Sequence, residues 1–219
     1  YQLSKDYQSG PLSFEYFNES DKIITNCGYG RKISKKTKLI SKFTSAQSTL
    51  CLDNTSVVKF KKNRLINKVY GPTISNSFKI FDIQREENKT EVILSATHNA
   101  YLKKFGYLHK RTIKFYKKNN TISGEDKLIK KNDNKKVNFS IRFHIYPGIN
   151  VVKTLSGKNI LLQINKKKSL VFTTNTENTQ VEKSIFLGRN KILNNQCIVI
   201  YGNTEDQDAN IEWELKKAS

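Results

Sequence analysis

The sequence predicts an all-β fold, a large antiparallel β-sandwich of two multi-stranded sheets with little helix. Short runs rich in Ile, Val, Phe and Tyr recur every ten to twenty residues, and clusters of Asn, Lys, Gly and Ser separate them. Within the runs apolar and polar residues alternate, which is the period of a strand. Helical spacing of useful length appears nowhere, so we expect under about 10% helix.

Twelve runs have the composition of strands. One of them, SIRFHIY, shows the alternation clearly: Ile141, Phe143 and Ile145 share one face and Arg142 and His144 the other. In chain order the runs are residues 12–17, 22–26, 48–53, 78–84, 91–97, 111–117, 137–146, 159–165, 169–174, 184–187, 196–202 and 211–216.

The segments between the runs have the composition of turns and loops. Residues 117–121, 130–136 and 155–159 fit hairpin connections. Residues 28–38 carry few apolar side chains, and we expect an exposed loop whose lysines are solvated. No repeat or long linker divides the chain, so residues 1–219 are predicted to form one domain.

Composition leaves two explanations for the net charge of +20. The chain has 33 Lys and 6 Arg, which fits a lysine-rich compositional drift, whereas planar recognition of phosphate or carboxylate usually employs Arg. A polyanionic partner is the other explanation. The three cysteines lack metal-site spacing, and no apolar run is long enough for a membrane span. Because the chain starts at Tyr1 and contains no Met, we expect a piece of a longer polypeptide.

Two of the three histidines lie in the stretch HNAYLKKFGYLHKR, residues 98–111. By strand parity His98 continues an apolar face, and His109 and Arg111 share a face with Ile113. We expect the strand to run from the interior to a polar cleft in which His109 and Arg111 emerge. The alternative is that local carboxylates or carbonyls satisfy both side chains inside the sheet.

This stretch could support proton transfer and sugar binding. A neutral histidine can accept a proton near pH 7, and an arginine can hold a carboxylate. We predict that His98, Tyr101, His109 and Arg111 line one polar depression, with residues 102–106 as the hairpin connection. The sequence has no Gly-x-Ser-x-Gly elbow and no phosphate-binding glycine loop.

Several blocks in a fixed order resemble the C-terminal β-domain of heparinase II/III-like proteins. The most specific are H-N-x-Y at 98–101, G-x-x-H-x-R at 106–111 and R-F-H-x-x-P at 142–147. They are accompanied by PLSFEY at 11–16, NCG at 26–28, SAQSTLCLD at 45–53 and GEDKL at 124–128.

The resemblance implies a polysaccharide lyase in which a helical toroid precedes the β-sandwich. It implies β-elimination on an acidic, uronate-containing polysaccharide, with the main catalytic residues on the helical domain. His98 and His109 would assist catalysis, and Tyr101 and Arg111 would bind substrate. The expected partners are this polysaccharide and the protein's own N-terminal helical domain, and the expected location is the periplasm or cell envelope.

The resemblance also bears on metal binding, because some members hold a metal through H-[SN]-T and H-N-G-Y blocks. Here Gln47 replaces the first histidine, and residues 61–68 contain no acidic side chain. Gln47 and His98 alone do not make a zinc site, so we expect no metal and no other cofactor. The alternative function is a non-catalytic carbohydrate- or envelope-binding sandwich with decayed sites. Nucleic acid is not expected, because the strand patterns of RNA-binding folds are absent.

Overall fold

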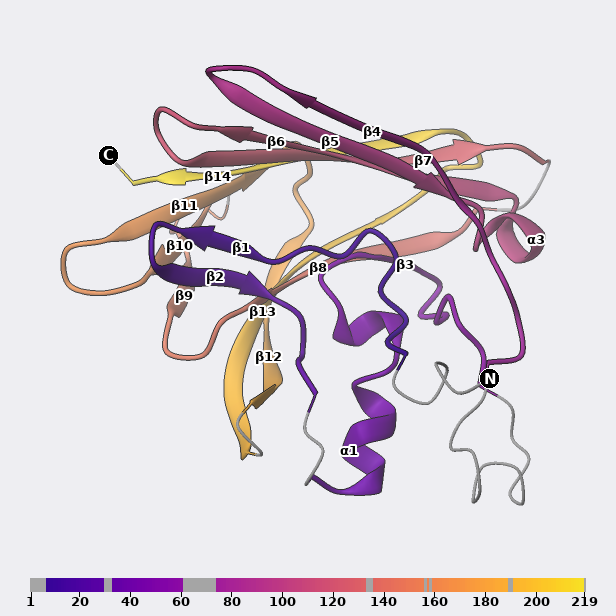
Figure 1. Cartoon of the computed structure of the whole chain (residues 1–219), viewed down its shortest axis with the longest axis horizontal. Coiled ribbons are helices and arrows are strands. Elements are labelled where there is room, and N and C mark those ends of the chain that lie inside the picture. Colours follow the sequence, from indigo (N-terminus) through magenta and orange to yellow (C-terminus); the bar gives the residue numbers. More distant parts are fainter. Residues whose placement is uncertain are drawn as a thin grey trace.

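The protein consists of two facing antiparallel β-sheets. The structure is a computed structural model, and it describes residues 7–29, 33–60, 74–132, 136–155, 157, 159–188 and 191–218. In Figure 1 the larger sheet lies across the top and the smaller sheet lies below it. All strand pairs described are antiparallel. The predicted antiparallel β-sandwich is therefore confirmed.

The smaller sheet has six strands in the order β1-β2-β8-β13-β12, and β3 also pairs with β8. Its strands are β1 (Tyr16–Asn18), β2 (Asp21–Thr25), β3 (Leu50–Leu52), β8 (Asn138–Ile145), β12 (Thr179–Gly188) and β13 (Lys191–Asn203).

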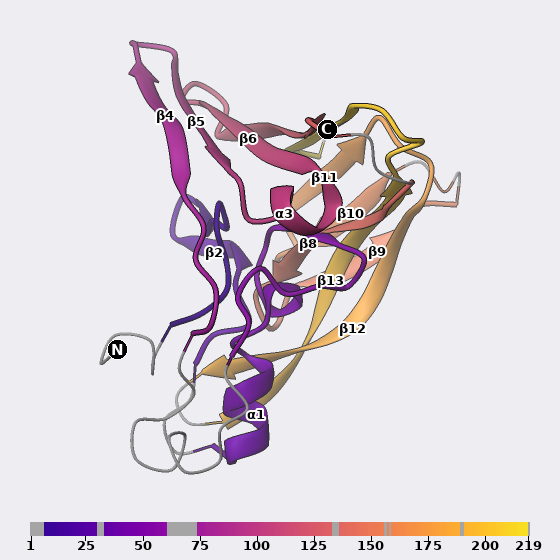
Figure 2. The ribbon, with the colours of Figure 1, turned by 90° about the vertical axis from the view of Figure 1, so that its right-hand side faces the viewer.

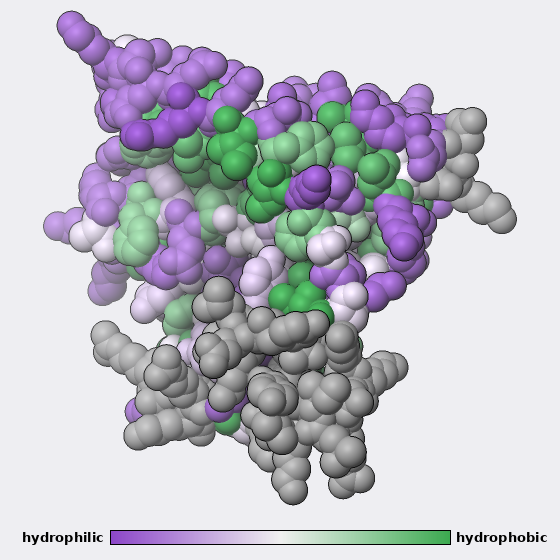
Figure 3. Space-filling model, turned by 45° about the vertical axis from the view of Figure 1, so that its right-hand side comes forward, coloured by the Kyte–Doolittle hydropathy of each residue, from purple (hydrophilic) through white to green (hydrophobic). Residues whose placement is uncertain are grey.

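The larger sheet has eight strands in the order β4-β5-β6-β7-β14-β11-β10-β9. Figure 2 shows that the β4–β5 hairpin projects beyond the body of the molecule, and hydrophilic side chains cover most of the top of Figure 3. The strands are β4 (Ile80–Glu87), β5 (Glu91–His98), β6 (Tyr107–Tyr116), β7 (Thr121–Lys130), β9 (Asn150–Lys153), β10 (Ile160–Gln163), β11 (Ser169–Thr174) and β14 (Ala209–Lys217).

Aromatic rings join the two sheets in the core. The Phe143 ring, from β8 of the smaller sheet, lies 5.0 Å from Phe172 and 4.9 Å from Trp213, both from the larger sheet. Phe14 stacks on Trp213 at 5.5 Å and lies 6.4 Å from Phe143. Aromatic contacts of this kind add to the free energy gained from area burial, so they hold the two sheets face to face.

Little of the described chain is helical, as predicted, and the described helices are short. They are α1 (Lys35–Ile40), α3 (Leu102–Phe105) and the 3-10 turn η2 (Thr44–Ala46). No helix in the described part of the chain is long and apolar enough to cross a membrane.

The prediction of an exposed loop over residues 28–38 is wrong for the last part of this segment, because α1 begins at Lys35. The Ser34 side chain accepts a hydrogen bond from the Thr37 amide at 3.3 Å, which caps the helix. Six residues are fewer than two helical turns, so apolar periodicity could not reveal this helix. Residues 30–32 of the expected loop lie outside the described part of the chain.

Two strands were absent from the prediction, β7 and the short edge strand β9. β7 contains the sequence Gly124-Glu125-Asp126, which is typical of a turn. It is nevertheless a strand because Trp213 occupies the space beside Gly124: a Cβ atom there would lie 2.2 Å from the indole. The glycine is required by a residue far away in the sequence.

Candidate functional site

The β5–β6 hairpin places His98 and His109 directly opposite each other. Their ring nitrogens, Nε2 of His98 and Nδ1 of His109, are 3.1 Å apart. The connection is residues 99–106 and so includes the predicted 102–106; it contains α3, and Gly106, with φ +75°, ends that helix. This left-handed conformation suits a glycine that terminates a helix.

Asp126 of β7 is the acceptor at the centre of the cluster. The Nε2 atom of His109 lies 2.7 Å from its Oδ1. Arg111 donates from Nε to Oδ1 at 2.8 Å and from Nη2 to Oδ2 at 3.0 Å. Trp213 donates from Nε1 to Oδ2 at 3.0 Å. The carboxylate is thus fully hydrogen-bonded, as a buried charge must be.

Arg111 also connects the larger sheet to the segments that cross beneath it. Its Nη1 atom donates to the carbonyl oxygens of Leu12, at 2.9 Å, and Ser48, at 2.8 Å. The guanidinium therefore joins β6 to two parts of the chain distant in sequence.

Hydrogen-bond donors and acceptors admit one distribution of protons in this cluster. The ionised Asp126 can only accept, so His109 carries its proton on Nε2 and accepts at Nδ1. His98 then donates from Nε2 and accepts at Nδ1, which receives the backbone N–H of Ala100 at 3.2 Å. If His109 were doubly protonated, both nitrogens of His98 would have to accept, which a neutral imidazole cannot do. Both histidines are therefore neutral.

Electrostatics agrees with this assignment. Burial, followed by the neighbouring His109 and Arg111, lowers the pKa of His98 well below its ordinary value. Burial also lowers the pKa of His109 and outweighs the opposing effect of Asp126. Burial alone would raise the pKa of Asp126, but Arg111 and His109 outweigh it and hold that pKa well below its usual range.

The prediction that the four residues line an open polar depression is wrong, although the four residues do lie together. His98 and His109 are 0% exposed, Tyr101 is 1% and Arg111 is 2%. Tyr101 donates to the Leu50 carbonyl at 3.0 Å. The alternative, satisfaction by a carboxylate and by carbonyls, holds for His109 and Arg111. An inner face can accept these polar groups because every charge has a partner.

Sequence reasoning missed Asp126 and Trp213. In β7, Ile122, Asp126 and Leu128 share the inner face and are buried. An acid on an otherwise apolar face is the signal that could have marked Asp126, once the strand was recognised.

Comparison with known proteins identifies the family. The sequence matches the family described as Heparinase II/III-like, C-terminal, over residues 1–214. The chain belongs to this family. No curated protein sequence matches it.

Solved structures show that the fold of this heparinase II/III-like chain is shared. It superposes on heparan sulfate lyase HepC from Pedobacter heparinus with a TM-score of 0.74 at 16% identity, covering 97% of this chain and 31% of that one. It superposes on heparinase III with a TM-score of 0.71 at 13% identity, covering 96% of this chain and 30% of that one. The chain thus spans about a third of these proteins' length.

The metal site of some heparinase II/III-like members does not fit the residues present here. The Gln47 side chain donates to the Ser41 carbonyl at 2.8 Å, and both nitrogens of His98 are engaged in hydrogen bonds. Among the described residues, no three His, Cys, Asp or Glu side chains are grouped to hold a metal ion. Residues 61–68 lie outside the described part of the chain. The absence of a metal and of other cofactors stays a prediction.

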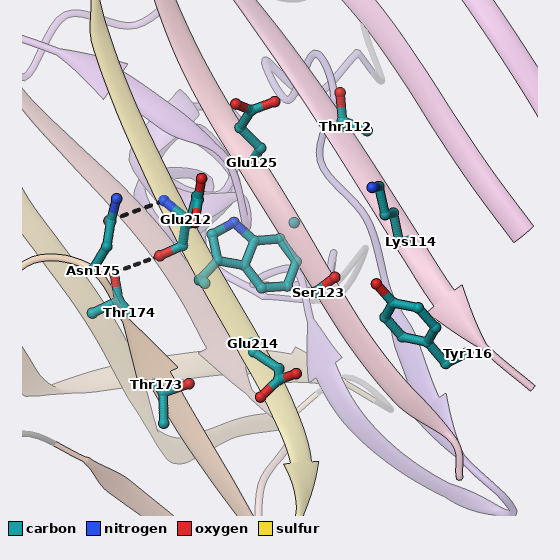
Figure 4. A pocket seen from close by; sticks show the side chains of 12 residues that line it. Thr112, Lys114, Tyr116, Ser123, Glu125, Thr173, Thr174, Asn175, Glu212 and Glu214 are labelled. Atoms are coloured by element: carbon teal, nitrogen blue, oxygen red, sulfur yellow. Dashed lines mark hydrogen bonds between the residues drawn. The ribbon is translucent and has the colours of Figure 1, made fainter. Parts of the chain in front are cut away.

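A hollow of about 480 Å³ lies on the outer face of the larger sheet (Figure 4), and Trp213, which donates to Asp126, is one of its lining residues. Figure 4 shows Glu125, Glu212 and Glu214 around it, with Lys114 and Tyr116 on β6. None of the four predicted site residues lines this hollow. Asp126, next to Glu125, points inward, so the strand separates the outer acids from the buried cluster.

Proposed function

We propose that this chain is the β-sandwich domain of a polysaccharide lyase that acts on acidic, uronate-containing polysaccharide by β-elimination. The observation that carries the proposal is membership of the heparinase II/III-like family over residues 1–214. HepC, which shares the fold, is a heparan sulfate lyase. In the proposed arrangement the domain closes the substrate cleft against an N-terminal helical domain.

The reaction removes the C5 proton of a uronate and breaks the bond between C4 and the glycosidic oxygen. A base takes the proton, a cation or donor neutralises the carboxylate, and an acid protonates the leaving oxygen. The main acid and base are expected on the helical domain. Direct catalytic roles for His98 and His109, and substrate contacts by Tyr101 and Arg111, stay predictions.

The buried cluster supports an indirect contribution from this domain. Nδ1 of His98 accepts the Ala100 amide, and the ring lies 5.4 Å from that of Tyr101. The hydrogen-bonded chain from Ala100 to Asp126 therefore holds the turn after β5 in one conformation. Positioning of this kind supports binding groups that lie on the turn.

The second candidate is a non-catalytic acidic-carbohydrate-binding domain. The observation that favours it is that His98, His109 and His144, the three histidines of the chain, are all buried. In this conformation none of them can transfer a proton to a substrate directly.

The test uses the full-length polypeptide and uronate-containing polymers, with unsaturated uronate product followed by absorbance. Turnover supports the lyase. Binding without turnover supports the second candidate, and neither binding nor turnover contradicts both. We also propose a periplasmic or cell-envelope location, which cell fractionation tests.

A further inference from the structure

A second hollow, of about 600 Å³, opens where the turn after β5 meets two other segments. Its walls, as far as the chain is described, come from residues 55–59, 75–77 and 99–105. Tyr101 and Ala100 belong to these walls, and Ala100 donates to the buried His98. This hollow, which we name the lysine hollow, therefore lies directly beside the buried cluster.

Hydrogen bonds between its walls hold the lysine hollow in shape. The Lys59 amide donates to Oδ1 of Asn76 at 2.6 Å, and Nδ2 of Asn76 donates to the Val57 carbonyl at 2.8 Å. Lys104 donates from Nζ to Oγ1 of Thr55 at 2.8 Å, and this bond joins the turn after β5 to residues 55–59. A site whose walls are already in place loses little entropy when a ligand binds.

The described lining of the hollow carries charge of one sign. Lys59, Lys103 and Lys104 line it, and the described lining contains no Asp or Glu. The side chains of Lys59 and Lys103 are exposed. The hollow therefore favours an anionic ligand, with an electrostatic contribution that salt will weaken.

The uncharged lining favours a sugar over a nucleic acid. Hydroxyl and amide side chains stand between the lysines and can exchange hydrogen bonds with sugar hydroxyls; they are Thr55, Ser56, Ser75, Asn76, Ser77 and Asn99. Among the described lining residues the aromatic rings are those of Tyr101 and Phe105, which are only 1% and 8% exposed. They offer no surface on which a nucleobase could stack.

We propose that the lysine hollow binds an anionic sugar unit of an acidic polysaccharide, through its carboxylate or sulfate group. The inference takes its substrate class from the proposed function, and it adds the place of binding. The two histidines and Asp126 are positioning residues for this hollow, because they hold the turn on which Asn99, Ala100 and Tyr101 lie.

The experiment measures binding of defined probes to this 219-residue chain by isothermal titration calorimetry. The probes are an unsulfated uronate tetrasaccharide, a sulfated one, inorganic sulfate and an acidic peptide of equal charge. The test variant is Lys59→Gln with Lys103→Gln, which removes two exposed charges from the hollow. The matched control is Lys114→Gln with Lys183→Gln, two exposed lysines that do not line it.

We expect at least one tetrasaccharide to bind, and the test variant to weaken Kd about tenfold, which corresponds to about 1.4 kcal/mol. The control should change Kd by less than about twofold, because scattered surface charges contribute little. Comparison of the two tetrasaccharides and inorganic sulfate identifies the recognised group. Lys104→Gln should weaken binding too, because it loses both a charge and the contact to Thr55.

Three results would overturn the inference: no binding of either tetrasaccharide, an equal loss in test and control variants, or a peptide that binds as tightly as the sugar. Its failure is distinguishable from failure of the proposed function. A full-length protein that turns over polymer while Lys59→Gln/Lys103→Gln binds normally refutes only the lysine hollow. Lysine-dependent binding without turnover refutes only the lyase.

Discussion

Asp126 is the residue on which the buried cluster depends. It accepts hydrogen bonds from His109, Arg111 and Trp213, and it balances the charge of a guanidinium that is 2% exposed. A buried ion pair of this kind adds little net stability compared with apolar residues, but removing one partner leaves an uncompensated charge. The stability of the sheet interior is therefore most sensitive at this carboxylate.

Asp126→Asn should lower the free energy of unfolding by about 3–5 kcal/mol, because Arg111 then stays buried without a counter-charge. Chemical denaturation measures this loss. The matched control is Glu125→Gln, one residue away on the outer face, which should change stability by no more than about 0.5 kcal/mol. Equal effects of the two substitutions would contradict the importance of the buried pair.

The lowered pKa values of the histidines predict how the free energy of unfolding depends on pH. The pKa of His98 and of His109 is lowered in the folded protein, and burial lowers the pKa of His144 to about 4. Below the unfolded value of about 6.5, the unfolded chain binds protons that the folded chain does not. The stabilisation is fully present above about pH 6.5 and is lost as pH falls through the folded values.

We therefore expect the free energy of unfolding to decrease between pH 7 and pH 4.5. The contribution of His144 alone is about 3 kcal/mol when fully lost, from its pKa change. Denaturant titrations at a series of pH values test this, and His144→Gln should reduce the slope. A free energy that stays constant over this range would show that the histidines are not buried and neutral.

At the scale of elements, the packing of β7 against β14 depends on Gly124. A Cβ atom on this residue would lie 2.2 Å from Cζ2 of Trp213, and the same indole donates to Asp126. Gly124→Ala should lower stability by about 1–3 kcal/mol through overpacking. Because the chain has a single Trp, its fluorescence emission should shift as the ring moves.

Gly148→Ala is the control for this substitution. Gly148 has a φ of +95° but nothing within 4 Å of a Cβ, so alanine there strains the backbone without contacting Trp213. The Trp213 fluorescence emission of the Gly148→Ala variant should match that of the unsubstituted protein. An unchanged emission in Gly124→Ala would contradict the close approach of β7 to the indole.

The elements show what local sequence could and could not predict. The hairpin that pairs His98 with His109 followed from alternation and from the turn residues 102–106, because both are local signals. β7 did not, because its Gly-Glu-Asp sequence is explained only by Trp213, which lies 89 positions after Gly124 in the sequence. Burial of the cluster also depended on Asp126, one of 19 acids with no local signature.

At the scale of the whole molecule, the net charge of +20 is distributed unevenly between the two hollows. Among its described lining residues the outer hollow carries three glutamates and one lysine, Lys114, whereas the lysine hollow carries three lysines and no acid. A polyanion would therefore be attracted more strongly to the lysine hollow than to the outer hollow. This distribution bears on the choice between compositional drift and a polyanionic partner, because drift alone predicts no such difference.

The proposed division of labour between this chain and a helical domain gives the last prediction. This chain spans about a third of the length of HepC and heparinase III, and its histidines are buried with their ring nitrogens in hydrogen bonds. The isolated chain should therefore produce no unsaturated uronate from any uronate polymer, while still binding acidic oligosaccharides. The full-length polypeptide, assayed in parallel, is the positive control. Unsaturated product made by the purified chain, and abolished by His109→Ala without loss of fold, would show that these histidines reach the substrate through a conformation more open than the one described.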